Sequence, residues 1–254
     1  MNEQRVTFGN CRGETLVGVL HHAGEERKAG SVILCHGMES DKNSDKLVVL
    51  SRRLAASGIA TLRFDFSYVG ESGGKFENIT YSGEVEDLRA AFDRMQDEYP
   101  GKTAILGSSM GGTVALMFAA QEPRVAALVT IAAPLHPENF PKRILTARQL
   151  KKWRDRGHTL YNGRRLNVTL LEDLERIQVA DAVRQIRCPV LILHGDADEV
   201  VPVAEAFELH DCVNHVKRLS ILKDTDHRLA NPAGMRQAMA EAVAWLKEHL
   251  GLFH

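Results

Sequence analysis

The feature that most restricts the fold is a regular alternation of short apolar runs with stretches of helical periodicity. Most of the runs are apolar at consecutive positions, which is typical of parallel strands covered by helices on both faces. The helical stretches are 84–99, 110–121, 202–212 and 231–250. The alternation predicts one doubly wound, mostly parallel α/β sheet, with strands at 32–35, 60–62, 104–106, 128–131, 190–193 and 219–222.

Two further segments complete the predicted organisation. Residues 6–8 and 14–21 are expected to form an N-terminal antiparallel pair. Residues 135–187 separate two predicted strands and are too many for an ordinary connection. They hold helical stretches and few strand signals, so we expect an inserted helical cap within a single domain spanning 1–254.

Charge and composition restrict the partners. A formal net charge of −1 over 254 residues gives no general attraction to nucleic acid or anionic membranes. The N-terminus lacks the apolar core of a secretory signal, and the longest nearly apolar run, 126–135, is about half of what spans a bilayer. These features predict a cytoplasmic protein with reduced cysteines and no nucleic-acid or membrane partner; the cysteines are Cys11, Cys35, Cys188 and Cys212.

The strongest chemical signal is the pentapeptide Gly107-Ser108-Ser109-Met110-Gly111, which reads G-x-S-x-G. It follows a predicted strand and precedes a predicted helix, which is the context that a nucleophilic serine on a sharp turn requires. The two glycines leave room for the crowded backbone, and the helix that follows points its N-terminus at developing negative charge. Ser109 is the predicted nucleophile.

Serine is a weak nucleophile and needs a base, which in turn needs an orienting acid. His227 follows the last predicted strand, so a base there would hang over the sheet edge to which Ser109 points. His194 is expected to shape a turn at the end of the preceding strand. The other histidines after Ser109 are expected on the surface or in packing roles: His136, His158, His210, His215, His249 and His254.

The acid is expected in the loop 194–202, which the strand 190–193 delivers to the same edge. Asp196, Asp198 and Glu199 compete for this role. Asp226 is adjacent to His227, but neighbouring side chains in a loop face each other poorly, so it is expected to stabilise a turn.

Two backbone N–H groups must stabilise the oxyanion that forms on the substrate carbonyl. The residue after the nucleophile, Met110, supplies one of them. The loop His36-Gly37-Met38 follows the strand 32–35 and supplies the other from Met38. No cofactor or metal is expected, because the motif positions offer no cluster of His and Cys ligands.

In order and spacing, these motifs resemble the α/β-hydrolase superfamily of serine hydrolases over essentially the full chain. The family loop H-G-x-x-D-x-x-V-P is similar to residues 194–202 and implies that Asp198 is the acid. Residues 63–74 resemble the family segment R-x-D-x-x-G-x-G-x-S-x-G, although Tyr68 stands where glycine is usual. This segment and residues 77–80 most resemble small cinnamoyl or feruloyl esterase-like carboxylesterases.

The resemblance implies hydrolysis of a small-molecule carboxylic ester, with aryl or hydroxycinnamoyl esters as candidates, through a Ser-His-Asp triad and an acyl-enzyme. A thioesterase, an acyltransferase or a peptidase could use the same triad, and a non-catalytic ligand-binding protein on this fold is a remote alternative. The prediction leaves room for a homodimer. The expected substrate-binding residues are His36, Gly37 and Trp153, with Phe140 and Tyr161 as further pocket candidates.

Positive charge gathers in the predicted cap. Residues 135–187 contain 12 Lys or Arg and 6 Asp or Glu. Either the cap steers substrates that carry a carboxylate or phosphate, or these side chains form a solvated helix face.

Overall fold

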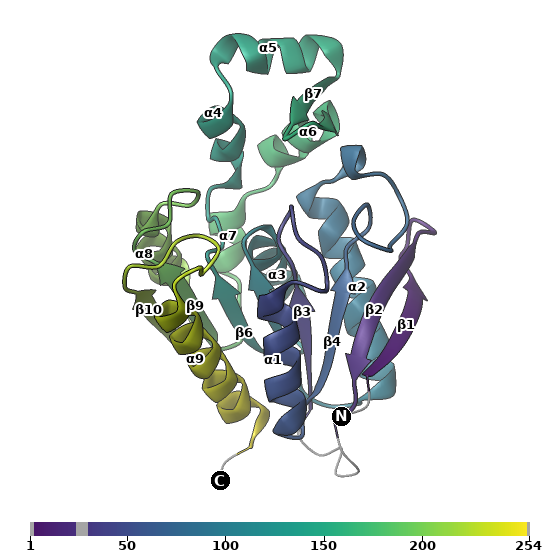
Figure 1. Ribbon diagram of the computed structural model, residues 1–254, viewed down its shortest axis with the longest axis vertical. Coiled ribbons are helices and arrows are strands. Elements are labelled where there is room, and N and C mark those ends of the chain that lie inside the picture. Colours follow the sequence, from purple (N-terminus) through teal and green to yellow (C-terminus); the bar gives the residue numbers. More distant parts are fainter. Residues whose placement is uncertain (1–2, 24–29, 253–254) are drawn as a thin grey trace.

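The computed structural model describes residues 3–23 and 30–252, and it confirms the predicted α/β-hydrolase sheet (Figure 1). Its strands are β1 (Glu3–Gly9), β2 (Thr15–His21), β3 (Ser31–Cys35), β4 (Ala60–Asp65), β5 (Thr103–Ser108), β6 (Val125–Ile131), β9 (Val190–Gly195) and β10 (Lys217–Leu222). They lie in the order β1-β2-β4-β3-β5-β6-β9-β10. The predicted N-terminal pair is antiparallel, β2 also pairs antiparallel with β4, and all other neighbours are parallel. Met1, Asn2 and His254 lie outside the described residues.

Helices cover both faces of this sheet (Figure 1). α1 (Asp45–Ala56) and α9 (Pro232–Leu250) lie on one face, and α2 (Tyr81–Glu98), α3 (Met110–Gln121) and α8 (Val203–Cys212) lie on the other. Alternate residues of β3 therefore enter different cores: Val32 and Leu34 lie under α1 and α9, whereas Ile33 and Cys35 lie under α2 and α3. Because both faces are buried, the strand is apolar at every one of these positions.

Local sequence explains the ends of the helices. The side chain of Asn231 accepts a hydrogen bond from Ala233 N and Pro232 is the first residue of α9, so the predicted start of this helix is confirmed. α2 begins three residues before its prediction, because Thr80 caps it by accepting from Gly83 N. α1 was not among the predicted helices.

Residues 132–189 connect β6 to β9. Residues 137–176 rise above the edge of the sheet, whereas residues 179–183 pack against α3 and α8 (Figure 1). We call residues 132–189 the inserted segment; the range predicted as a cap lies within it. Two of its strands form an antiparallel hairpin that was not predicted, with a two-residue turn at Asn162 and Gly163. Both turn residues have positive φ, 48° and 76°, as this tight type of hairpin turn requires. The elements are η2 (Pro137–Asn139), α4 (Phe140–Ile144), α5 (Ala147–Arg156), β7 (His158–Tyr161), β8 (Arg164–Asn167), α6 (Val168–Arg176) and α7 (Val179–Val183).

The loop after β4 shows how the chain tolerates Tyr68 where the related segment has glycine. Tyr68 has φ 78°, a conformation that costs a non-glycine residue free energy. Its ring lies against Gly74, where an added Cβ would stand 2.1 Å from the ring, so the glycine at 74 makes space for the tyrosine. The short helix η1 (Phe76–Asn78) follows.

No helix within residues 3–23 and 30–252 is long and apolar enough to cross a membrane.

Candidate active site

Ser109 occupies the sharp turn between β5 and α3, with φ 54° and ψ −126°. The flanking glycines are required by close backbone contacts. A Cβ on Gly107 would lie 2.2 Å from the carbonyl oxygen of Gly111, and a Cβ on Gly111 would lie 2.2 Å from that of His36. The strained turn therefore depends on both glycines of the G-x-S-x-G motif, as the sequence predicts.

The three residues predicted as a triad are linked by hydrogen bonds through His227. His227, in the loop between β10 and α9, places Nε2 3.0 Å from Ser109 Oγ and Nδ1 2.8 Å from Asp198 Oδ2. An ionised carboxylate can only accept, so the Nδ1–H donates to Asp198 and the Nε2 lone pair is left to accept from the serine hydroxyl. This is the arrangement that a general base needs.

Asp198 is held in its ionised form by several donors. Burial by itself would raise its pKa, but hydrogen bonds from His194, His227 and the backbone N–H of Val201 together lower the pKa well below its usual range. His194, predicted to shape the turn, also bonds the carbonyl of Val201 at 2.9 Å. The histidine therefore supports the acid as well as the loop.

The competing carboxylates lie elsewhere. Asp196 and Glu199 are exposed, and no hydrogen bond joins either one to His227 in the described part of the chain. Asp226 accepts from the backbone N–H of Ala230 at 2.7 Å, which is the turn-stabilising role predicted for it.

The loop from His36 to Met38 lies directly against Ser109. An added Cβ on Gly37 would stand 3.1 Å from Ser109 Cβ, which is tighter than an ordinary contact, so glycine eases this close approach. The backbone N–H groups of Met38 and Met110 donate no hydrogen bond within the described ranges, so both remain available to a substrate oxygen. His36 is buried, and its ring nitrogens bond Gly37 O and Phe66 N, which fixes the shape of the loop.

Ser109 and His227 line a cavity of about 870 Å³. Part of its lining is apolar or aromatic and includes Tyr81 of α2 together with Phe140, Leu170 and Pro134 of the inserted segment. Lys46 of α1 and Arg228 of the β10–α9 loop also line the cavity. None of Lys46, Arg228 and Tyr81 was predicted, since isolated residues carry no motif.

The predicted pocket residues have different positions. Phe140 and Tyr161 line the cavity, with ring centroids 5.4 Å apart. Trp153 does not line it: the indole is 1% exposed inside the inserted segment, where the helix α5 and its neighbours bury it. The expectation for Trp153 is thereby corrected, because a large apolar side chain on an otherwise charged helix is needed to anchor that helix.

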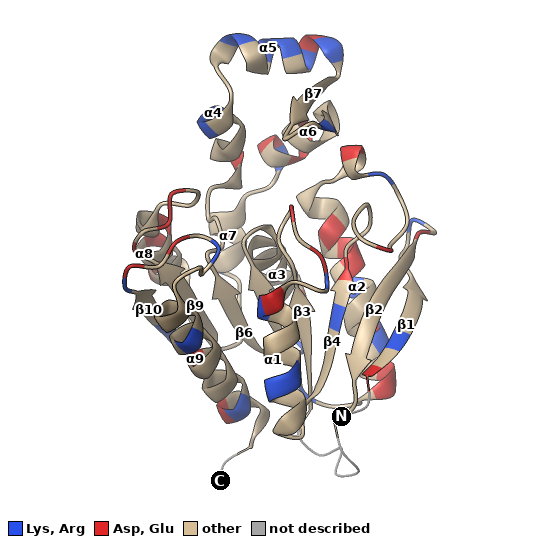
Figure 2. Cartoon of the chain, viewed as in Figure 1, with Lys and Arg blue, Asp and Glu red and all other residues tan. Residues whose placement is uncertain are grey.

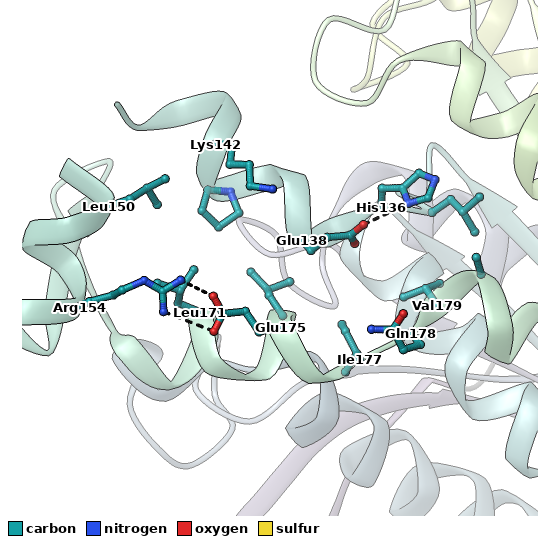
Figure 3. A pocket seen from close by; sticks show the side chains of 14 residues that line it. His136, Glu138, Lys142, Leu150, Arg154, Leu171, Glu175, Ile177, Gln178 and Val179 are labelled. Carbon is teal, nitrogen blue, oxygen red and sulfur yellow. Dashed lines mark hydrogen bonds and ion pairs between the residues drawn. The ribbon is translucent and has the colours of Figure 1, made fainter. Parts of the chain in front are cut away.

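A second cavity, of about 350 Å³, lies within the inserted segment (Figure 3). His136 borders both cavities. The Arg154–Glu175 ion pair crosses one wall of the second cavity, and His136 bonds Glu138 on another.

Most of the positive charge of the inserted segment lies away from Ser109. Several Lys and Arg positions lie along α5, at the outer end of the molecule (Figure 2). Of the basic residues between 142 and 156, Arg143 alone lines the Ser109 cavity, and Glu205 binds its guanidinium.

Comparison with known proteins agrees with this fold. Residues 26–162 match the family model described as serine aminopeptidase, S33. Palmitoyl-protein thioesterase ABHD10 of Homo sapiens is 26% identical over 223 residues, covering 82% of this chain and 70% of that protein. The structure of Est1E from Butyrivibrio proteoclasticus with bound ferulic acid has a TM-score of 0.85 and 22% identity, covering 96% of this chain and 99% of Est1E. The esterase domain of a Rhodothermus marinus protein has a TM-score of 0.77 and 30% identity, covering 99% of this chain and 100% of the domain.

A sheet of this order with a serine on the turn after β5 defines an α/β-hydrolase, here of the esterase and thioesterase type. The chain belongs to the serine aminopeptidase S33 family. Membership leaves the substrate open, because on this fold it is selected by the residues around the nucleophile.

Proposed function

We propose that the protein is a serine carboxylesterase in which Ser109, His227 and Asp198 form the catalytic triad. The observation that carries this proposal is the continuous set of hydrogen bonds from Ser109 Oγ through His227 to Asp198. The same order of contacts generates a serine nucleophile on unrelated folds.

The proposed reaction has two halves. Ser109 Oγ attacks the ester carbonyl as His227 Nε2 takes the hydroxyl proton, and the N–H groups of Met38 and Met110 stabilise the oxyanion. The carbon–oxygen bond to the alcohol then breaks, His227 gives its proton to the departing oxygen, and an acyl-Ser109 ester remains. Water, deprotonated by His227, attacks this ester, releases the acid and restores the serine hydroxyl.

The apolar residues in the cavity lining, among them Tyr81, Phe140 and Leu170, support an aryl or aliphatic acyl group. A thioester is a second candidate substrate, because the relative ABHD10 is described as a palmitoyl-protein thioesterase. The acyl-enzyme is the same for an oxygen or a sulfur leaving group, so kcat/KM for matched esters and thioesters separates the two.

We also propose a reducing compartment, such as the cytoplasm. The four cysteines are free thiols, three of them buried, and disulfides are rare under reducing conditions. ABHD10 is described as mitochondrial, so the compartment is best decided by imaging the tagged full chain.

The test of the triad is substitution of the nucleophile. Ser109→Ala is expected to lower kcat for a phenyl ester by roughly 10⁴-fold or more and to abolish labelling by a fluorophosphonate probe. Ser57→Ala lies at the C-terminal end of α1, away from the cavity, and is the matched control. It is expected to keep both the esterase activity and the labelling. Folded Ser109→Ala that turned over the ester at the wild-type rate would overturn the proposed mechanism.

A further inference from the structure

Lys46 is a half-buried cation in the wall of the cavity that contains the nucleophile. Its Nζ donates to the hydroxyl of Ser108, the residue before Ser109, at 3.1 Å. It makes no ion pair with a carboxylate in the described ranges, unlike Lys42 nearby, which binds two. A partly desolvated ammonium with one neutral acceptor has unused capacity to bind an anion.

Three charged groups act on Lys46 from nearby loops, and none of them binds its ammonium directly. Burial lowers the pKa of Lys46, whereas attraction to Asp226 and Asp198 favours its charged form and Arg228 opposes it. The Asp198 carboxylate accepts hydrogen bonds from His227 and from Val201 N, and Asp226 accepts from Ala230 N. Neither carboxylate forms an ion pair with Lys46 in the described ranges.

The other charged residues that line the cavity are accounted for separately. Arg143 is bound to Glu205, and Glu39 accepts from Tyr161 and Asn162. Asp45 is exposed beside Lys46, and adjacent helical residues do not face each other. Arg228 is exposed, lines the cavity and forms no ion pair among the described residues. His136 also lines the cavity and is paired with Glu138 and Glu208. Among the described residues that line the cavity, Lys46 and Arg228 are therefore the two cations without a carboxylate partner.

Both cations are associated with the loops that carry His227 and Asp198. His227 must reach the departing oxygen, so the alcohol half of the substrate lies beside it. Arg228 is the next residue, and the groups whose charge Lys46 senses belong to the two loops that carry His227 and Asp198. The apolar lining residues, among them Tyr81, Phe140 and Leu170, are then available to the acyl half.

We propose that Lys46, assisted by Arg228, binds a carboxylate on the alcohol half of the substrate, so that the protein prefers esters with an anionic leaving group. This inference rests on the proposed esterase function and adds a substrate class to it. Hydrogen bonds to charged groups exceed neutral ones in strength, which predicts a preference of about tenfold or more from Lys46. Arg228 is exposed and contributes less, because water screens it.

The experiment compares matched substrates. 4-Acetoxybenzoate carries the carboxylate on the leaving group, and methyl 4-acetoxybenzoate is its neutral counterpart; monophenyl succinate and methyl phenyl succinate place the same difference on the acyl side. The readout is the ratio of kcat/KM for the anionic ester to that for the neutral ester. Comparing this ratio between variants cancels the difference in leaving-group reactivity within a pair.

In Lys46→Met the ratio for the acetoxybenzoate pair is expected to fall by about tenfold or more, through a higher KM for the anionic ester. Lys46→Arg keeps the charge and is expected to retain most of the ratio. Lys223→Met removes an exposed lysine outside the cavity lining and is the matched control, with a ratio within about twofold of wild type.

Three results would overturn the inference. The ratio could be unchanged in Lys46→Met; both esters could lose kcat/KM equally, which would make Lys46 a positioning residue that acts through Ser108; or the ratio could change only for the succinate pair. Turnover of the neutral ester by wild type keeps the esterase function intact in each case. A protein that hydrolyses neither ester and resists the fluorophosphonate probe overturns both proposals.

Discussion

Two ion pairs show how differently the sheet and the inserted segment use charge. Lys42 and Asp65 meet at 2.6 Å with side chains that are 3% and 0% exposed, and Asp65 also accepts from Lys42 N. Arg154 and Glu175 pair on the inserted segment with about half of each side chain exposed. The Lys42–Asp65 pair fixes the end of the loop that carries Met38. Water competes for the hydrogen bonds of the exposed Arg154–Glu175 pair. The Lys42–Asp65 pair is therefore expected to be structural, whereas the Arg154–Glu175 pair is expected to tolerate substitution.

The largest expected effect tests the buried pair. Lys42→Met leaves Asp65 as a buried charge that has lost its cation, so the free energy of unfolding should fall by about 3–5 kcal/mol. Hydrogen bonds to Asp65 and Glu71 outweigh burial and raise the pKa of Lys42, which agrees with a tightly held ammonium. Urea denaturation measures the change, and a loss below about 1 kcal/mol would contradict this account of the loop.

An intermediate effect concerns a buried histidine of the sheet. Burial lowers the pKa of His21 to about 4 from its ordinary 6.5, and its Nε2 accepts from Arg63. In the folded protein the imidazole is therefore neutral where the unfolded chain already binds a proton. Stability should fall as the pH drops from about 6.5 to about 4, by about 1–3 kcal/mol from this residue.

The pH dependence of urea denaturation, compared between wild type and His21→Gln, isolates this contribution. The glutamine keeps an acceptor for Arg63 but binds no proton, so its stability should fall less between pH 6.5 and 4. Parallel curves for the two proteins would exclude His21 as the source.

The smallest effect is expected on the inserted segment. Arg154→Ala removes an ion pair whose partners are both half exposed, which should change the free energy of unfolding by less than about 1 kcal/mol. Thermal and urea denaturation, together with kcat/KM for a neutral ester, provide the comparison with Lys42→Met. A loss above about 2 kcal/mol would show that the inserted segment depends on its charges as much as the sheet does.

The sequence predicts the sheet because strands buried on both faces carry a continuous apolar signal, as β3 does. The predicted strands also locate the site, because parallel strands deliver successive loops to one edge of the sheet. Ser109, His227 and the loop 194–202 all follow such strands. The choice of Asp198 required the family resemblance, because spacing alone does not separate it from Asp196.

The sequence predictions fail where contacts between distant parts of the chain determine the position of a residue or element. Asn162-Gly163 is a strong turn signal, but it lies between short polar strands that lack a clear alternation, and the hairpin was missed. Trp153 looks like a pocket residue until the burial of α5 is known. Lys46 is an ordinary helical lysine in sequence, and only the fold brings it to the wall of the Ser109 cavity.

The conformation of Ser109 also has an evolutionary consequence. At φ 54°, and with Gly37 against its Cβ, the position disfavours a branched Cβ. Threonine would keep the hydroxyl but strain the turn, whereas cysteine or aspartate has the unbranched Cβ that the turn accepts. The backbone therefore permits substitutions that would change the chemistry at position 109, such as cysteine or aspartate, but disfavours the conservative exchange of serine for threonine.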